Sequence, residues 1–417
     1  MSSAFANDSH PGRPRILFVG FGGSSHTHSW IDLLEHTGFN VRLFDLPTST
    51  LPPADWWVPC YVTAVPARPP DPSRRRCLYP SARLGWLTRH IRGRLAGSPE
   101  RVIERWLGRV IRSWHPHIVH TLGLDPAGLL YDRVRRTLEP ALKPTWVLQL
   151  RGGSDLTLSR LDPELRPSLS GALAAADQIL SDNLVNVRYA RELGIDENRF
   201  SPLAPVPGTG GVDIEGLRAA ASTPVEQRRA VLWPKAYESR WSKAMPVIEA
   251  LRRAWPAIAP CSILMLAASD ETRAWIRTLP EDLQRVITAE AWVPRAKSLE
   301  LMGRARVMLA PSLIDGTPNT MFEAMACGAL PVVSPLETIR DVVVDGENVL
   351  FARNLYPEEI AGALVRAMTD DALVARCAAA NLELVRRRAN RATIGPRVVA
   401  FYEELATSGR PSATGTA

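Results

Sequence analysis

The sequence has few cysteines and no long apolar run. Its five cysteines are widely spread and form no C-x-x-C pair, which argues against a disulfide framework and against a zinc ribbon. No apolar run approaches the roughly 18 residues that suggest a membrane span, and the first residues, MSSAFANDSHPGRPR, lack the apolar centre of a secretory signal. We therefore expect a folded protein of a reducing cytoplasm.

Histidine is absent from most of the chain, because all eight histidines lie before residue 121. His26 and His28 form one pair, and His115, His117 and His120 form a second group. No carboxylate or cysteine sits beside them at a spacing typical of metal ligands. The sequence therefore predicts no metal site and no essential metal cofactor.

Acidic residues are scarce in one segment of the chain. Between Arg68 and Arg112 there are twelve arginines but only three acidic residues. Within this Arg-rich segment, residues 102–114 place apolar side chains at helical spacing, with charged residues on the opposite face. Two interpretations stay open: a helix packed on the core with a solvated charged side, or a surface for an anionic membrane or a phosphorylated lipid acceptor. No recognition motif accompanies the charge, so nucleic acid is not an expected partner.

The length of the chain predicts two domains, because 417 residues exceed the size at which one hydrophobic core keeps growing. Strand-like runs alternate with amphipathic stretches, which is the pattern of parallel sheets covered by helices. A loop-like linker lies around residues 207–228. The expected parts are a Rossmann-like N-terminal domain (1–212), a Rossmann-like C-terminal domain (229–395), a C-terminal helix that is a candidate for return to the first domain (396–407) and a disordered tail (408–417).

The first expected strand is followed by glycines. Open α/β sheets bind ligands at the carboxyl ends of their strands, so the crevice between two such domains is the expected site. Gly22 and Gly23, in VGFGGSSH, either let the backbone approach a ligand phosphate or sugar or simply form a tight turn. A dinucleotide fingerprint needs a third glycine where Ser25 stands, so a nicotinamide-dependent oxidoreductase is only a minor alternative.

The segment PSLIDGTPNTMFEAMACGALPVVSPLE, residues 311–337, combines a turn, a helix start and a carboxylate inside the helix. Thr320 and Glu323 have the T-x-x-E spacing of a capping box, which would explain the helix start without any ligand. A capping box does not need Asp315 or the Gly-x-Pro turn after it. Open N–H groups at Thr317, Asn319 and Thr320, together with the helix dipole, favour a diphosphate at this end of the helix.

This segment resembles the signature of the retaining glycosyltransferases of family 4, which are group 1 glycosyltransferases of GT-B architecture. The signature P-S-x-x-E-G-x-P-x-x-x-x-E-A-M-A-x-G is matched here by Pro311, Ser312, Asp315, Gly316, Pro318, Glu323, Ala324, Met325, Ala326 and Gly328. Residues 176–213 and 343–351 are also similar to the family. The resemblance implies an α/β fold of two Rossmann-like, doubly wound parallel-sheet domains facing across a cleft. It also implies transfer of a sugar, with retention of anomeric configuration, from a nucleoside diphosphate donor.

The resemblance implies roles for the residues of the signature. Glu323 would bind the hydroxyls of the donor ribose, and Asp315 would contact the transferred sugar near its reacting carbon. The amides of Gly316, Thr317, Asn319 and Thr320 would bind the diphosphate.

Further roles fall on residues outside the signature. The family's basic pair, which offsets charge on the departing diphosphate, is best matched by Lys235 and Lys243, with Arg240 as a competitor. Trp292 and Val293 stand where the family's backbone holds the nucleobase.

Several positions depart from the family pattern or stay unassigned. Asp315 replaces the usual glutamate, so its carboxylate reaches about 1.5 Å less far, the length of one carbon–carbon bond. Arg151 stands where relatives often have histidine, which leaves Arg151 and Asp155 as candidates for the sugar or the acceptor. His26 is either an acceptor-side group or a polar residue at a helix start. His120 lacks a second histidine two residues later, and we expect it in the core.

The sequence thus predicts a cytoplasmic retaining glycosyltransferase that uses a nucleoside diphosphate sugar as co-substrate and needs no other cofactor. The acceptor stays unidentified: a glycan, a lipid-linked molecule or a small natural product. The Arg-rich segment 68–112 would supply peripheral contact with an anionic membrane. The alternative, motivated by Asp315, is a non-catalytic homologue that binds a nucleotide sugar and regulates a partner.

Overall fold

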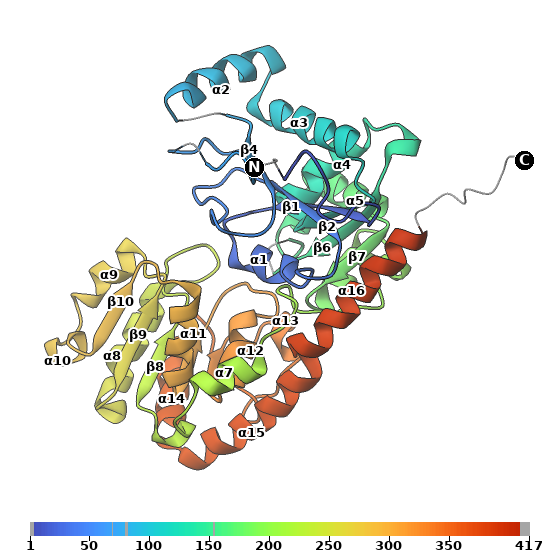
Figure 1. The fold of residues 1–417 in the computed structure, drawn as a ribbon. Helices are drawn as coiled ribbons and strands as arrows, with labels where there is room; N and C mark the ends of the chain where they lie inside the picture. The colour runs from blue at the N-terminus through green and yellow to red at the C-terminus, as the bar shows by residue number, and fades with distance from the viewer. Residues whose placement is uncertain (1–3, 69, 80–81, 153–154, 409–417) are drawn as a thin grey trace, which may run out of the picture.

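The computed structural model describes residues 4–68, 70–79, 82–152 and 155–408, and within them the chain forms two α/β domains (Figure 1). In this part of the chain the N-terminal domain has a seven-stranded parallel sheet of order β4-β3-β2-β1-β5-β6-β7. Its strands are β1 (Arg15–Gly20), β2 (Asn40–Asp45), β3 (Cys60–Val62), β4 (Arg75–Cys77), β5 (Ile118–Leu122), β6 (Thr145–Leu150) and β7 (Gln178–Ser181).

Both faces of this sheet are covered by helices, because alternate residues of the central strand β1 point to opposite sides. Leu17 and Val19 pack in one core cluster with residues of α3 to α6, whereas Ile16 and Phe18 pack in another with residues of α1 and α16. The helices of this domain are α1 (Ser25–Ile31), α2 (Ala82–Ala96), α3 (Pro99–Trp114), α4 (Leu129–Arg135), α5 (Arg166–Ala175) and α6 (Val185–Glu192).

The C-terminal domain has, in its described residues, a six-stranded parallel sheet of order β10-β9-β8-β11-β12-β13. Its strands are β8 (Ala230–Trp233), β9 (Ser262–Leu266), β10 (Ile287–Glu290), β11 (Val307–Ala310), β12 (Leu330–Val333) and β13 (Leu350–Phe351). Its helices are α7 (Ile214–Ala220), α8 (Ala244–Ile258), α9 (Asp270–Ile276), α10 (Glu281–Gln284), α11 (Arg295–Arg304), α12 (Asn319–Ala326), α13 (Glu337–Arg340), α14 (Pro357–Thr369) and α15 (Asp371–Arg388). The expected pair of parallel-sheet domains is therefore confirmed.

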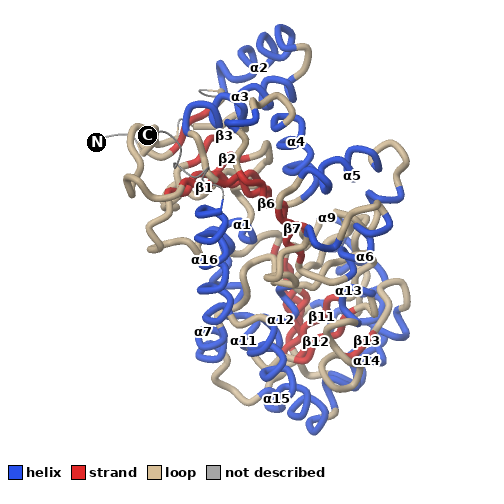
Figure 2. Tube along the Cα trace, turned by 90° about the vertical axis from the view of Figure 1, so that its right-hand side faces the viewer, coloured by secondary structure: helices blue, strands red, loops and turns tan. Residues whose placement is uncertain are grey.

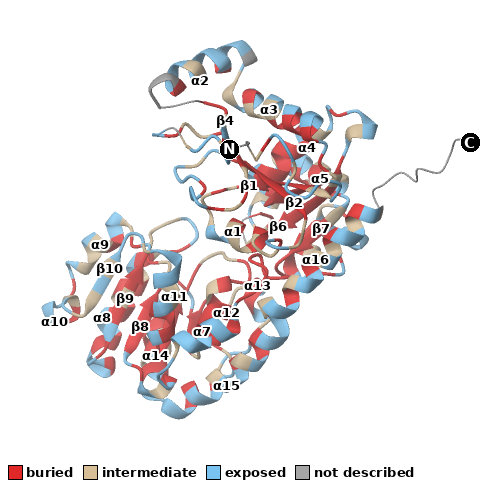
Figure 3. Cartoon of the chain, viewed as in Figure 1, coloured by how far each residue is buried: buried red, intermediate tan, exposed pale blue. Residues whose placement is uncertain are grey.

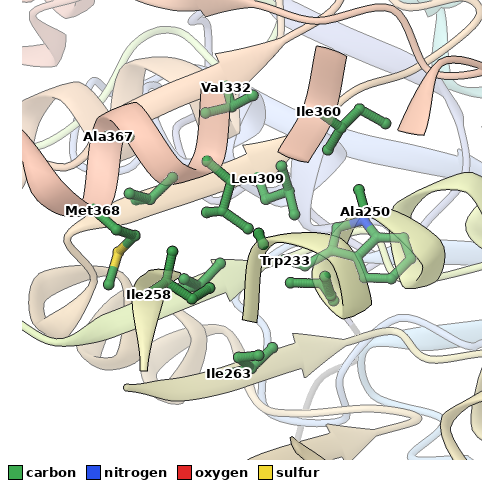
Figure 4. Close-up of a cluster of buried hydrophobic side chains, with 14 of the residues drawn as sticks. Trp233, Ala250, Ile258, Ile263, Leu309, Val332, Ile360, Ala367 and Met368 are labelled. Atoms are coloured by element: carbon green, nitrogen blue, oxygen red, sulfur yellow. The ribbon is translucent and has the colours of Figure 1, made fainter. Parts of the chain in front are cut away.

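The core of the C-terminal domain also lies on both faces of its sheet. Figure 4 shows one cluster, in which Ile258 of α8 and Met368 of α14 pack over the strands beside Trp233, Ile263 and Leu309. A second cluster joins the other face to α7, α11, α12 and α15. In Figure 3 the buried residues accordingly follow the two sheets, while the outer faces of the helices are exposed.

The last helix, α16 (Arg391–Ser408), leaves the C-terminal domain and packs against the first domain (Figure 2). The hydroxyl of Tyr402, fully buried, accepts a hydrogen bond from Trp30 Nε1 at 3.0 Å and lies 2.5 Å from Nδ1 of His120. Burial, with a smaller contribution from the charge of Arg151, lowers the pKa of His120 well below its usual value. His120 is thus a neutral core residue, as its sequence context indicates.

The chain crosses between the domains twice, and the two crossings are hydrogen-bonded to each other. The backbone N–H of Val212 donates to the carbonyl of Ala389 at 2.7 Å, and the N–H of Arg391 donates to the carbonyl of Val212 at 3.0 Å. Gly211 fits here only because it has no side chain, since a Cβ would lie 2.5 Å from the Ala389 carbonyl oxygen and its φ of +89° disfavours other residues.

Candidate functional site

The two domains meet where loops follow the carboxyl ends of strands. Gly316, in the loop between β11 and α12, lies so close to the first domain that a Cβ there would be 2.6 Å from Cα of Gly152 and 2.6 Å from Oδ2 of Asp182. Gly152 follows β6 and Asp182 follows β7. This contact is at the edge where open parallel sheets bind ligands.

An ion pair lies beside this contact. Lys235, which follows β8, places its Nζ 2.6 Å from Oδ2 of Asp315, and β8 and β11 are neighbours in the sheet. Burial lowers the pKa of Lys235, but the charge of Asp315 raises it, and the net shift is upward. Lys235 is therefore a fixed cation at neutral pH. The turn itself is tied down, because the Thr338 hydroxyl donates to the Asp315 carbonyl at 2.8 Å and the Thr317 hydroxyl donates to the Thr338 carbonyl at 3.0 Å.

Helix α12 begins without a side-chain cap. Pro318 is its N-cap residue, and no side chain bonds to its first-turn N–H groups. Thr320 therefore stands inside the first turn, where its buried hydroxyl has no hydrogen-bond partner in the part of the chain that the structure describes. The capping-box interpretation of Thr320 and Glu323 is wrong. Open first-turn N–H groups with the helix dipole behind them favour an anion.

The carboxylate of Glu323 is paired with a residue that the sequence did not indicate. Only 3% of the Glu323 side chain is exposed, and Arg295 contacts it through both terminal nitrogens, with Nη1 3.2 Å from Oε2. Arg295 is the first residue of α11, where the helix dipole disfavours a cation. The sequence signal that could have identified Arg295 is a basic residue at the start of a helix, two positions after Val293.

Asn319 links the site to the first domain. Its Oδ1 accepts a hydrogen bond from the Thr209 hydroxyl at 2.7 Å, and its Nδ2 lies 3.5 Å from Nδ1 of His26 in α1. The imidazole of His26 keeps access to solvent but lies between the walls of both domains. Desolvation and then the nearby charges of Arg151 and Lys235 lower the pKa of His26 to about 4, so it is neutral at pH 7.

The other two cations expected near the diphosphate have different neighbours. Nζ of Lys243 lies 2.7 Å from Oε1 of Glu238, and the guanidinium of Arg240 lies 4.6 Å from the centre of the Trp241 ring. The structure thus brings Lys235, and neither Lys243 nor Arg240, to Asp315.

The candidates on the first domain make mainly internal contacts. Oδ2 of Asp155 accepts hydrogen bonds from the backbone N–H groups of Arg151 (2.7 Å) and Leu124 (3.1 Å), so this carboxylate holds together the loops after β5 and β6. Arg151 donates from Nε to Oε1 of Gln149 at 2.8 Å, while its buried Nη2 has no partner among the described residues. Burial lowers the pKa of Arg151 to about 10.

The glycines after β1 are explained by packing. A Cβ on Gly22 would lie 2.5 Å from Cγ of Pro52, and one on Gly23 would collide with Thr50. The N–H of Gly22 donates to Oδ1 of buried Asp45 at 2.7 Å. A close turn therefore accounts for both glycines.

A cavity of about 200 Å³ adjoins the Lys235–Asp315 pair. Aromatic rings of Trp233, Tyr237 and Trp241 line it, and Gly152 closes it from the first domain. Trp292, by contrast, is 76% exposed, and the neighbouring Val293 packs at the edge of the core. Within the described residues, no three metal-ligating side chains come together.

Comparison with known proteins agrees with the arrangement at α12. The family model described as Glycosyl transferases group 1 matches residues 239–370. A phosphatidyl-myo-inositol mannosyltransferase from Mycobacterium leprae is 27% identical over 346 residues, which cover 75% of this chain and 86% of that protein. Residues 239–370 of the chain are thus similar to the group 1 glycosyltransferases.

Solved structures share the fold of this chain along nearly its whole length. A sucrose-phosphate synthase from Thermosynechococcus elongatus has a TM-score of 0.68 at 15% identity, covering 95% of this chain and 100% of that one. Alr3699/HepE from Anabaena, in complex with UDP-glucose, has a TM-score of 0.67 at 14% identity, covering 94% and 99%. The expected GT-B architecture is confirmed.

The contact at Gly316 predicts a steric effect. Gly316→Ala should cost about 1–3 kcal/mol of stability, because the new methyl group meets the backbone of Gly152 and the carboxylate of Asp182. Gly362→Ala is the matched control: this glycine lies exposed inside α14 with nothing within 4 Å, so the change should stabilise by about 0.5–1 kcal/mol. Calorimetry measures both, and a Gly316→Ala protein as stable as the native one would contradict the contact.

Asp182 predicts a pH dependence. Burial, reinforced by the charge of Asp315, raises the pKa of Asp182 from 3.8 to about 7, although hydrogen bonds from Gly152 and Asn183 oppose the rise. Between these values the folded protein keeps a proton that the unfolded chain has lost, so this contribution to stability falls as the pH rises toward 7.

The variant Asp182→Asn cannot titrate at this position. The thermal midpoint of the native protein minus that of the variant should therefore be larger at about pH 5 than at about pH 8. Asp55→Asn, a change at an exposed aspartate, should give no such trend. A constant difference for Asp182→Asn across this range would show that Asp182 is ionised throughout.

Proposed function

We propose that the protein transfers a sugar from a nucleoside diphosphate sugar to an acceptor, with retention of anomeric configuration. The observation that carries the proposal is the Lys235–Asp315 ion pair beside the uncapped first turn of α12, at the contact between the two domains. This arrangement offers positive charge and open N–H groups at one point, next to a carboxylate. The positive charge and the N–H groups suit an anionic leaving group, and the carboxylate suits the sugar that is transferred.

The diphosphate would bind at α12. The N–H groups of Thr317, Asn319 and Thr320 and the helix dipole would contact its oxygens, joined by the N–H of Gly316 if it releases Oδ1 of Asp315, to which it donates at 3.0 Å. Lys235 would offset the charge that develops as the bond to the sugar breaks. These groups are fixed before the reaction, so they need little reorganisation. With such cations in place, the proposal includes no metal. Alr3699/HepE from Anabaena, which shares the fold, has been solved in complex with UDP and glucose and in complex with UDP-glucose.

The ribose would bind at Glu323, and this requires Arg295 to leave. A carboxylate as buried as Glu323 needs a compensating partner while no donor is present, and Arg295 supplies it. The ribose hydroxyls would replace the guanidinium as hydrogen-bond donors. Trp292 and Val293, three and two residues before Arg295, would border the nucleobase.

The sugar would lie at the cavity beside Asp315, where the carboxylate contacts it near the reacting carbon. In the proposed reaction the transition state resembles an oxocarbenium ion, and the departing phosphate oxygen takes the proton of the acceptor. We place the acceptor beside neutral His26 and Arg151, whose Nη2 has no partner among the described residues. Lys243 and Arg240 would reach the diphosphate only by leaving Glu238 and Trp241.

The acceptor class and the location belong to the same proposal. The mannosyltransferase relative is named for a phosphatidyl-inositol, a membrane lipid. We propose a cytoplasmic enzyme that is peripheral to an anionic membrane, with contact through the Arg-rich segment 68–112. No helix in the described part of the chain is long and apolar enough to cross a membrane.

A panel of nucleoside diphosphates tests the donor. We expect at least one of UDP, GDP, ADP, CDP and dTDP to raise the thermal midpoint without magnesium, because a ligand that binds only the folded state stabilises it. A panel in which none raises it would overturn the donor proposal. A nucleotide sugar with the same base as the stabilising nucleoside diphosphate then serves as substrate. Its slow hydrolysis provides an assay that needs no acceptor.

Asp315→Asn should separate binding from turnover. The diphosphate is held elsewhere, so affinity for the nucleoside diphosphate should change less than about threefold, while hydrolysis should fall about a hundredfold. Asp341→Asn, at an exposed aspartate of the same domain, is the control and should leave both unchanged. Equal hydrolysis by Asp315→Asn and the native enzyme would make Asp315 only a turn residue. If Asp315→Glu gained activity over an inactive native protein, the non-catalytic alternative would hold.

A further inference from the structure

Helix α2 exposes an apolar stripe that the domain core does not use. Trp86 is 71% exposed and Leu95 81%, and Leu87 and Ile91 are also exposed. Leu87, Ile91 and Leu95 follow one another at intervals of four residues, which places them on one side of the helix. In Figures 1 and 3 α2 projects from the end of the N-terminal domain as an exposed helix.

This stripe points away from the protein. Among the residues of α2 whose burial the structure describes, Gly85 and Gly93 are the buried ones, and a Cβ on Gly85 would lie 2.5 Å from Cγ1 of Val65. With about 100° between successive residues, the direction midway between the two glycines is opposite to the direction of Ile91. The side of α2 that carries Gly85 and Gly93 therefore faces the domain, where Arg92 donates from Nη1 to the Leu78 carbonyl at 2.6 Å, and the side with Leu87, Ile91 and Leu95 faces solvent.

Arginines are numerous on α2 and on the neighbouring helix α3. Helix α2 contains no acidic residue, and Arg89, Arg92 and Arg94 are exposed along it. Helix α3 adds four more exposed arginines: Arg101, Arg105, Arg109 and Arg112. Glu104, one of the few acids nearby, is already paired with Arg133. The apolar stripe thus lies within a strongly cationic surface.

The other amphipathic helix of the Arg-rich segment is occupied. The apolar face of α3 is buried in the core through Val102, Leu107, Val110, Ile111 and Trp114. For α3 the core-facing interpretation is therefore correct, and a contact through the Arg-rich segment has to be made by α2.

We infer that α2 docks on an anionic membrane, with Leu87, Ile91 and Leu95 among the lipid chains and the arginines of α2 and α3 at the headgroups. Apolar insertion and basic flanks are the two requirements of interfacial helices. A hollow of about 430 Å³ between α2 and α3, lined in part by Trp86, Arg89, His90 and Arg94, offers room for a headgroup phosphate.

Other partners fit this surface less well. A second copy of the chain would bring the arginines of both copies together, and like charges repel. A nucleic acid would satisfy the arginines but leave the outward leucines and isoleucine in water. The membrane alone matches both the charge and the apolar stripe, and binding to it does not depend on the donor proposal.

Vesicle sedimentation of the full chain tests the inference. The native protein should sediment with vesicles of phosphatidylcholine and phosphatidylglycerol, and should stay in solution with phosphatidylcholine alone. The triple variant Leu87→Gln, Ile91→Gln and Leu95→Gln should lower the partition coefficient at least about tenfold. Glutamine is a good helix former, so α2 should persist.

Matched controls separate this surface from general effects. Arg89→Gln with Arg94→Gln should weaken partition about fivefold per charge at low salt, and high salt should remove that difference. Two control variants should bind as the native protein does: the pair Leu161→Gln and Leu355→Gln, at exposed leucines elsewhere, and the pair Arg387→Gln and Arg388→Gln, on α15.

The inference would be overturned if binding of the native protein did not depend on lipid charge, or if the triple variant bound normally. A native dimer that the triple variant abolishes would also overturn it, because the stripe would then be an interface between copies.

Discussion

The close approach of Gly316 to Gly152 and Asp182 is the constraint on which the site depends. Two sheets that fold around separate cores need a place where their carboxyl edges can touch, and a side chain at position 316 would hold them apart. The contact puts the uncapped start of α12 opposite α1 and the loop after β6. Lys235 and Asp315 belong to one domain, His26 and Arg151 to the other, and only this approach makes them parts of a single site.

The charges of the site are neutralised by ion pairs within the protein. Lys235 is paired with Asp315, Arg295 with Glu323 and Lys243 with Glu238. The proposed diphosphate-sugar donor would therefore have to replace these ion-pair partners, because the charged groups of the site are already paired. Breaking a pair with a buried member costs several kcal/mol unless the new partner is equally good. Such an exchange favours a ligand that satisfies the carboxylates through hydroxyls and the cations through phosphates, and it disfavours a simple anion, which could satisfy only the cations.

Most of the fold and the centre of the site could be predicted from the sequence, because they depend on short patterns. Asp315 and Lys235 follow neighbouring strands, so the strand order brings them together over a separation of 80 residues. The start of α12 was less predictable: with Pro318 at the N-cap, Thr320 lies two positions too late to cap. Arg295 could not be paired with Glu323 from sequence, since the reach of a long side chain depends on its rotamer. Likewise, the spacing of Leu87, Ile91 and Leu95 shows that they share a side of α2 but not whether another element covers it.

The two crossings between the domains limit how the cleft can change. Because the crossing at Val212 is hydrogen-bonded to Ala389 and Arg391, the segments lie side by side rather than at opposite ends of the interface. One domain can then rotate about these two hydrogen-bonded segments, and its displacement is largest at the edge farthest from them. Sliding or twisting of one domain on the other would break the hydrogen bonds between the two segments. Opening would be smallest near these segments and largest at the outer rim, so substrates would enter from the side of the molecule farthest from α16.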